Sequence, residues 1–299
     1  MNETRNIAAA SDGQTVYKGR ALAQETWRRF LKNKGALVGM IFMILLVILA
    51  CAGDIIYDYD TDVIGFSADL SKAPSLNHPF GTDQLGRDIL ARVVYGSRYS
   101  LIIGMGSVAL GLVVGLILGS LAGFYGGAWD QVVMRANDIL YAIPNIMLAV
   151  VIVQLLGKSI GSLVVALSIS SATSFAKITR ASVMTIQGQE YIESAYAMGL
   201  PTWKIILRHV IPNCLSPIIV QVTLSIGSNI ISASSLSFLG VGVPIPMPEW
   251  GTMLSEGRTY IVSEPWLCIF PGLAIMFTVL ALNLLGDGLR DALDPKLKR

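Results

Sequence analysis

Residues 190–217, the most informative stretch of the chain, read EYIESAYAMGLPTWKIILRHVIPNCLSP. Its pattern predicts a short helix up to Met198, a turn over 199–201, and a second short helix that is capped by Thr202 and ends at Pro212. Two short helices joined at a glycine form a rigid loop. Because long apolar runs lie on both sides of it, this loop is predicted to connect two membrane spans.

The apolar residues of the chain are gathered into runs long enough to cross a bilayer, which takes about 20 residues. Of the 299 residues, 53% are hydrophobic and 14% are charged, whereas about a quarter of an average soluble domain is charged. The composition therefore indicates an all-α membrane protein with six transmembrane helices. The expected spans are 35–51, 100–125, 132–156, 160–178, 215–241 and 266–285.

The distribution of positive charge orients these spans. Sixteen of the 22 lysine and arginine residues lie near the termini, at the inner end of the third span or in the loop 176–212, and six lie on the other side. Cytoplasmic loops carry the excess of positive charge, so both termini are expected to be cytoplasmic. The expected regions are a cytoplasmic segment (1–34), a first transmembrane helix (35–56), an extracytoplasmic loop (57–96), a five-helix core (97–286) that contains the loop 187–213, and a cytoplasmic tail (287–299).

The cytoplasmic segment before the first span has a helical pattern of its own. Its apolar residues at helical spacing are Ala23, Trp27, Phe30 and Leu31. Basic residues lie on the other faces, which predicts a helix along the inner membrane surface. A cytoplasmic extension of the first span is the alternative.

Groups needed for several kinds of chemistry are missing from the predicted spans. The two histidines, His78 and His209, fall in loops, which excludes an intramembrane Ser-His protease. Gly157-Lys158-Ser159 matches the end of a phosphate-binding loop, but that motif requires glycine where Ile152 stands. The three cysteines lack metal-ligand spacing and are expected to be small core hydrophobes. A net charge of +2 without a basic stripe excludes nucleic acid as a partner.

Two spans carry patterns of small or polar residues. Glycine recurs every four residues at positions 111, 115, 119 and 123, which allows a neighbouring helix to approach closely. The fifth span has a polar stripe made of Ser225, Ser228, Asn229, Ser232 and Ser235. This stripe either packs against a neighbour or lines a hydrated translocation path. A second cluster slightly favours the path: Ser168, Ser170, Ser171, Thr173 and Ser174.

Asp138 is the candidate for an ionisable group inside a span. It lies near the inner end of the third span and three residues from Arg135. We expect an end-of-span ion pair between these two side chains, rather than a proton relay of the kind that drives secondary transporters.

Four stretches of the chain resemble permease subunits of ABC importers. Glu193, Ser194 and Ala195 stand where those proteins carry a glutamate-alanine-alanine element, and Gly199 and Pro212 follow at the usual spacing. Ser194 replaces the middle alanine, which is a mild departure. The other stretches are HPFGTDQLGRDILARVVYGSR (78–98), LGVGVPIPMPEWGTML (239–254) and PGLAIMFTVLALNLLGDGLRDALDPKLK (271–298). Together they are similar to the second permease subunit of dipeptide, oligopeptide, glutathione and nickel importers, over nearly everything after residue 25.

This resemblance implies the ABC type I importer permease fold, a place in a bacterial or archaeal cytoplasmic membrane, and uptake of a small peptide or a similar solute. The implied partners are a second permease subunit, two ATP-binding subunits that hold ATP and Mg, and an extracytoplasmic solute-binding protein. No cofactor, metal site or enzymatic activity is expected in this chain itself.

The resemblance also assigns roles to individual residues. The loop 187–213 would couple the chain to an ATPase, with Glu193 and Ala195 on the docked face and Gly199 at the bend. Pro248, Glu249 and Trp250 would touch the binding protein, although a rigid turn is equally compatible with them. The alternative function is a self-sufficient channel or secondary transporter, in which the loop is a plain connector, and a membrane-anchored scaffold is a third possibility.

Overall fold

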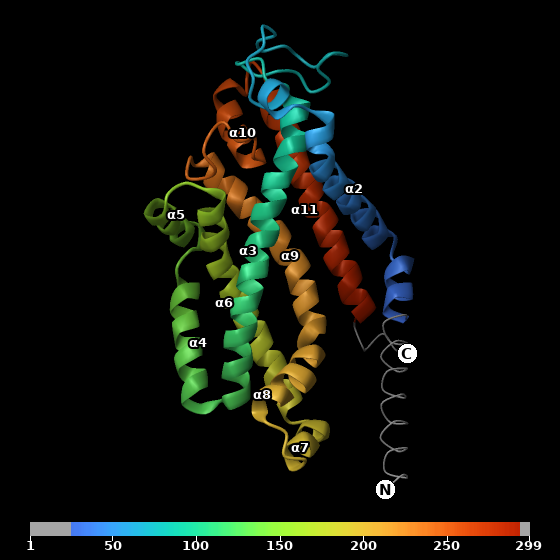
Figure 1. Ribbon diagram of the computed structural model, residues 1–299, viewed down its shortest axis with the longest axis vertical. Helices are drawn as coiled ribbons and strands as arrows, with labels where there is room; N and C mark the ends of the chain where they lie inside the picture. Colours follow the sequence, from blue (N-terminus) through green and yellow to red (C-terminus); the bar gives the residue numbers. More distant parts are fainter. Residues whose placement is uncertain (1–24, 294–299) are drawn as a thin grey trace.

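The computed structural model describes residues 25–293, and this part of the chain is built from helices (Figure 1). The longer helices are α2 (Lys34–Ile56), α3 (Ile89–Tyr125), α4 (Gly127–Ala142), α5 (Asn145–Leu156), α6 (Ile160–Gln187), α9 (Ile211–Phe238) and α11 (Trp266–Leu293). The short ones are η1 (Tyr59–Val63), α7 (Glu190–Ala197), α8 (Thr202–Ile205), η2 (Ile206–Val210), α10 (Trp250–Gly257) and η3 (Arg258–Tyr260). Helices α7 and α8 lie at one end of the bundle, and α10 lies at the other.

The described residues contain five helices long and apolar enough to span a membrane, and α4 with α5 forms a bent sixth candidate. The third span predicted over 132–156 is broken into two helices, which meet at an angle of 92°. Ile143 is extended and Pro144 follows it. Proline lacks the N–H of a helix interior and disfavours the helical conformation of the residue before it, so the break occurs here.

Two further helices are longer than predicted. Helix α3 begins at Ile89, where the Asp88 carboxylate caps it by accepting from the Ala91 N–H at 3.0 Å. The end of the expected outer loop (57–96) is therefore helical. Helix α6 continues to Gln187, so the loop predicted from residue 176 begins later.

Asp138 forms its ion pair across helices, at 3.1 Å from Lys177, rather than with Arg135.

The glycine pattern of α3 brings it against α6. A Cβ atom placed on Gly115 would lie 2.4 Å from the Cβ of Phe175, and one on Gly119 would lie 2.5 Å from the carbonyl oxygen of Ala176. Both distances are shorter than real contacts, so only glycine allows these helices to approach as they do. The predicted packing role of the glycine stripe is confirmed.

Residues near the two ends of the described chain pack together. The Asn33 side chain donates to the Asp291 carboxylate at 3.2 Å, and Phe30 is buried against Ala36 and Ala292. Residues 25–32 are helical, and the extended Asn33 then caps α2. The segment is thus not a continuous extension of the first span, while its place on the membrane surface stays a prediction. Ala23 lies outside the described residues.

Candidate functional site

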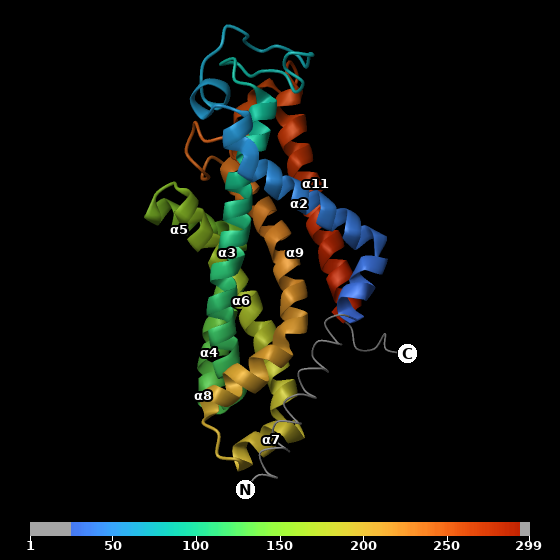
Figure 2. The same cartoon turned by 45° about the vertical axis from the view of Figure 1, so that its right-hand side comes forward.

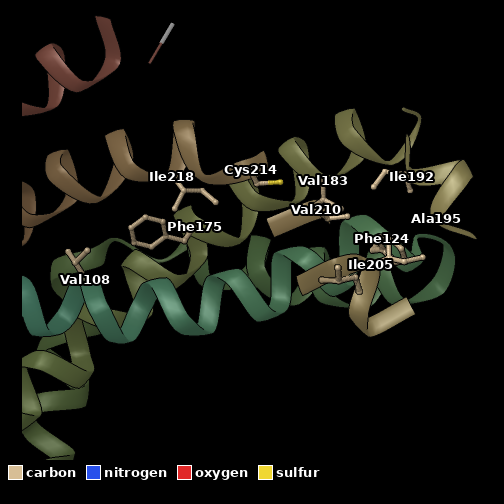
Figure 3. Close-up of a cluster of buried hydrophobic side chains, with 11 residues drawn as sticks. Val108, Phe124, Phe175, Val183, Ile192, Ala195, Ile205, Val210, Cys214 and Ile218 are labelled. Carbon is tan, nitrogen blue, oxygen red and sulfur yellow. The ribbon is translucent and has the colours of Figure 1, made fainter. Parts of the chain in front are cut away.

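Helix α7 is held against the end of the bundle by its apolar face. Ile192 and Ala195 are buried in a cluster with Phe124, Val183 and Val210, which come from α3, α6 and η2 (Figure 3). Figure 2 shows α7 and α8 beyond the inner ends of the long helices. Since apolar burial fixes the orientation of α7, movement of this helix would be transmitted directly to α3 and α6.

Gly199 makes the bend that follows α7. Its φ is +72°, a conformation that side chains with a Cβ rarely adopt. The Gly199 N–H donates to the Tyr196 carbonyl at 2.9 Å, and the Leu200 N–H donates to the Ala195 carbonyl at 3.2 Å. These two bonds form a Schellman motif, which satisfies the last carbonyls of the helix. The direction of the chain after α7 therefore depends on the positive φ of this glycine.

The second half of the loop differs from the prediction. Pro201, not Thr202, occupies the position before α8, and Pro212 does not end a helix. A π turn, η2, leads directly into α9, and Pro212 falls in the first turn of that helix, where an N–H is not needed. The amide of Asn213 donates to the His209 carbonyl at 2.6 Å. The loop 187–213 is thus continuous with α9; because the resemblance predicts a coupling role for it, it is called the coupling loop below.

The exposed face of the coupling loop carries both polar and large apolar side chains. Glu193 and Ser194 are exposed, whereas Ala195 is 1% exposed, so its predicted place on a docked face is wrong. Ala195 packs inside the chain instead. Sequence reasoning missed Met198 and Trp203, which are 72% and 63% exposed. Their signal was two large apolar side chains in a predicted extramembrane loop, and exposed apolar surface of this kind is typical of protein or membrane contact sites.

The polar stripe of α9 divides into two parts. Asn229 is buried and donates to Ser107 of α3 at 2.7 Å and to Ser171 of α6 at 2.9 Å, and Ser225 is also buried. These residues hold three helices together. Of the other serines of the stripe, Ser228 is exposed, while Ser232 and Ser235 are half-buried and their hydroxyls donate to carbonyls of their own helix.

A groove lies beside the less buried part of the stripe. It has a volume of about 440 Å³ and is formed by α9, α10 and α11, with Ser235 in its lining. The second serine cluster on α6 is divided in the same way, since Ser168, Ser171 and Thr173 are buried while Ser170 and Ser174 are half-buried. The groove is lined mainly by apolar side chains, and the role of the serines in a translocation path stays a prediction.

The loop before α10 is fixed by buried side chains. Glu249 accepts from the N–H groups of Gly251 and Thr252, at 2.9 Å each, and so caps α10. The indole of Trp250 donates to the Val93 carbonyl at 2.9 Å. Pro248 is buried as well, so these three residues form a rigid turn and present no surface to a soluble protein here. The exposed residues of this loop are Leu239, Gly240, Pro244, Ile245 and Pro246.

The segment between α2 and α3 is tied down by His78. Its two ring nitrogens lie 2.8 Å from the Asp88 carboxylate and 3.3 Å from that of Asp69. The hydrogen bond to Asp88, and secondly the bond to Asp69, raise the pKa of His78 above its usual value. Asp88 also caps α3, so its contact with His78 links the segment between α2 and α3 to the beginning of that helix.

Comparison with known proteins decides the class of this architecture. The sequence pattern of the binding-protein-dependent transport system inner membrane components matches residues 115–299. The chain belongs to this family. The pattern of the N-terminal transmembrane domain of oligopeptide transport permease C matches residues 21–76 of this permease.

Relatives match the permease over most of its length. It is 46% identical to the glutathione transport system permease protein GsiD of Pectobacterium atrosepticum, over 92% of this chain and 91% of that protein. It is 44% identical to the di/tripeptide transport system permease protein DppC of Pseudomonas aeruginosa, over 100% of this chain and 99% of that one.

A solved structure shows the same fold at low sequence identity. The permease resembles a chain of the inward-facing methionine ABC transporter MetNI with a TM-score of 0.58 and 19% identity, over 69% of this chain and 98% of that one. The fold is thus that of an ABC importer permease, and the protein is a multi-pass component of the inner membrane. ATPase activity belongs to its partner subunits, as binding-protein-dependent transport requires.

Proposed function

We propose that this permease is the second permease subunit of an ATP-driven importer for peptides, glutathione or similar small solutes. It would pair with a homologous permease and assemble with two ATP-binding subunits and an extracytoplasmic solute-binding protein. The names of its relatives GsiD and DppC support both the subunit type and this substrate range. ATP and Mg would be held by the ATP-binding subunits.

The observation that carries the proposal is the coupling loop. Its inner face is anchored by Ile192 and Ala195, while Glu193, Met198 and Trp203 are exposed at the end of the bundle. An ATP-binding subunit would cover that exposed face. A rigid element that is anchored on one side and docked on the other can pass on the motion of a partner.

Transport would then follow from two states of the paired permeases. Closure of the ATP-binding subunits would displace both coupling loops and open the permeases outward, and hydrolysis would return them to the inward state. Each ligand shifts this equilibrium only by its differential affinity for the two states. The less buried serines of α9, Ser228, Ser232 and Ser235, would line the path, because uncharged hydroxyls let a solute pass without tight binding.

The proposal is tested by reconstituting the purified components in liposomes. Uptake of a radiolabelled dipeptide should require ATP, the solute-binding protein and all membrane subunits, and the isolated chain should transport nothing. A self-sufficient channel or secondary transporter would instead give uptake with this chain alone. Such a result would overturn the proposal and turn the coupling loop into a plain connector.

A further inference from the structure

A polar pocket lies at the end of the molecule opposite the coupling loop. Its volume is about 330 Å³, and it is formed by the turn between α5 and α6, the end of α9, the loop after it, and α10. Since a cavity needs only about 10–15 Å³ of such volume to hold one water, the pocket has room for several waters or for the end of a peptide. The polar side chains among those that line it are Lys158, Ser237, Thr252, Ser255 and Glu256.

Ser237, one of the lining residues, carries a buried hydroxyl group. Its side chain is 3% exposed, and its hydroxyl has no partner among the described residues. The other hydroxyls are engaged: Ser255 donates to the Phe238 carbonyl at 3.2 Å, and Thr252 donates to Glu249 at the same distance. A buried hydroxyl without a partner lowers the stability of the fold unless a ligand or water forms a hydrogen bond with it.

The charge around the pocket favours an anion. Glu256 is neutralised, because its two oxygens lie 3.0 Å from Arg87 and 2.7 Å from Arg92, both of which are buried. Arg87 also pairs with Asp83 at 2.6 Å. Lys158 is exposed at the rim and has no ion-pair partner among the described residues. Of the two charged side chains that line the pocket, Glu256 is thus paired and Lys158 is not, which favours an anion beside the ammonium of Lys158.

We propose that this pocket binds the terminal carboxylate of a peptide or similar solute at the outer mouth of the permease. A carboxylate accepts hydrogen bonds and donates none, so it fits both the ammonium of Lys158 and the hydroxyl of Ser237. Lys158 then serves solute recognition, whereas Ser159 caps α6 by accepting from the Ser162 N–H. The peptide as ligand rests on the proposed function.

The test follows acylation of lysines in the complete complex in lipid nanodiscs. An amine-reactive acyl ester modifies Lys158 and Lys72, an exposed lysine on the outer segment that serves as the control in the same sample. The probe is N-acetyl-alanyl-alanine, which has a carboxylate but no amine. At twice its dissociation constant the probe should slow acylation of Lys158 about threefold and leave Lys72 unchanged. Ser237→Ala should remove most of this protection.

Three results would overturn the proposed carboxylate site. The first is that the C-terminal amide of the probe protects Lys158 from acylation as well as the probe does. The second is that acetate protects it equally, which indicates an adventitious anion only, and the third is that Lys158 is not acylated even without the probe. Dipeptide uptake by the same complex separates this inference from the proposed function. Uptake without protection defeats the pocket alone, whereas specific protection without uptake supports the pocket and defeats the transport proposal.

Discussion

The seam between α3 and α6 and the bend of the coupling loop both depend on glycine, for opposite reasons. Gly115 lies in regular helix, and its missing side chain makes room for Phe175. A Cβ on Gly199 would meet no atom within 4 Å, and glycine is required there by the backbone angle alone. The comparison teaches that one region sets how the bundle packs, whereas the other sets the direction of a surface element.

Breaking the seam should have the largest effect. Gly115→Val would place methyl groups where the Cβ alone already meets Phe175 at 2.4 Å, and this should cost about 1–3 kcal/mol or more. We expect the folded chain to be lost from the membrane, as measured by size-exclusion chromatography of a tagged protein. Gly106→Ala is the control, because its Cβ would meet Val164 at an ordinary 3.5 Å. Equal recovery of both variants would contradict the account.

Substitution at the bend should impair coupling and spare folding. Gly199→Val forces a positive φ on a β-branched residue, which costs about 1–3 kcal/mol locally. We expect normal membrane insertion together with loss of solute-stimulated ATPase activity in the reconstituted complex. Gly188→Val is the matched control, because Gly188 is in the same loop, has an equally open surrounding, and has a φ of −83°. Near-normal stimulation in Gly199→Val would refute the role of the bend.

The two parts of the α9 stripe should respond differently. Asn229→Leu removes hydrogen bonds to Ser107 and Ser171 and should lower stability by about 1–2 kcal/mol. Ser232→Leu should leave assembly unchanged and reduce solute uptake, because that side chain is only half-buried. Thermal melting and uptake of both variants give the comparison. Unchanged uptake in Ser232→Leu would assign the whole stripe to packing.

The smallest effect is expected at the outer segment, as a dependence on pH. Because the folded protein raises the pKa of His78, its charged pairs with Asp88 and Asp69 contribute fully below pH 6.5, the ordinary value. The contribution is lost as the pH rises through the higher folded-state pKa. The size should be about 1 kcal/mol or less. Proteolysis of the outer segment should therefore accelerate toward high pH, and His78→Gln should abolish that trend.

Features that depend on the length of apolar runs and on residue spacing could be predicted from the sequence. Six apolar runs indicated six spans, and the four-residue spacing of glycine indicated a packing face, since both features are local. The break in the third span could have been anticipated from Pro144, which lies within the apolar run. The sequence pattern also placed Gly199 at a helix end, where positive φ is common.

Other features depended on tertiary contacts that no local pattern encodes. Ala195 was expected on the docked face, but its side chain is buried with that of Ile192 in the core. Glu249 and Trp250 were expected either to touch a partner or to form a rigid turn, and capping of α10 together with packing on α3 buries them. Lys177 was counted with the loop 176–212, but it lies within α6, where it pairs with Asp138 of α4.

The central claim is that partner ATPases drive this permease through the coupling loop. It is tested most directly by purifying the tagged chain from its native membrane in mild detergent and identifying the proteins that accompany it by mass spectrometry. The account predicts a second permease and one or two ATPases, with crosslinks to the ATPases from a cysteine at Ser194→Cys. A chain that is recovered alone, and stays alone after gentle crosslinking, would contradict it.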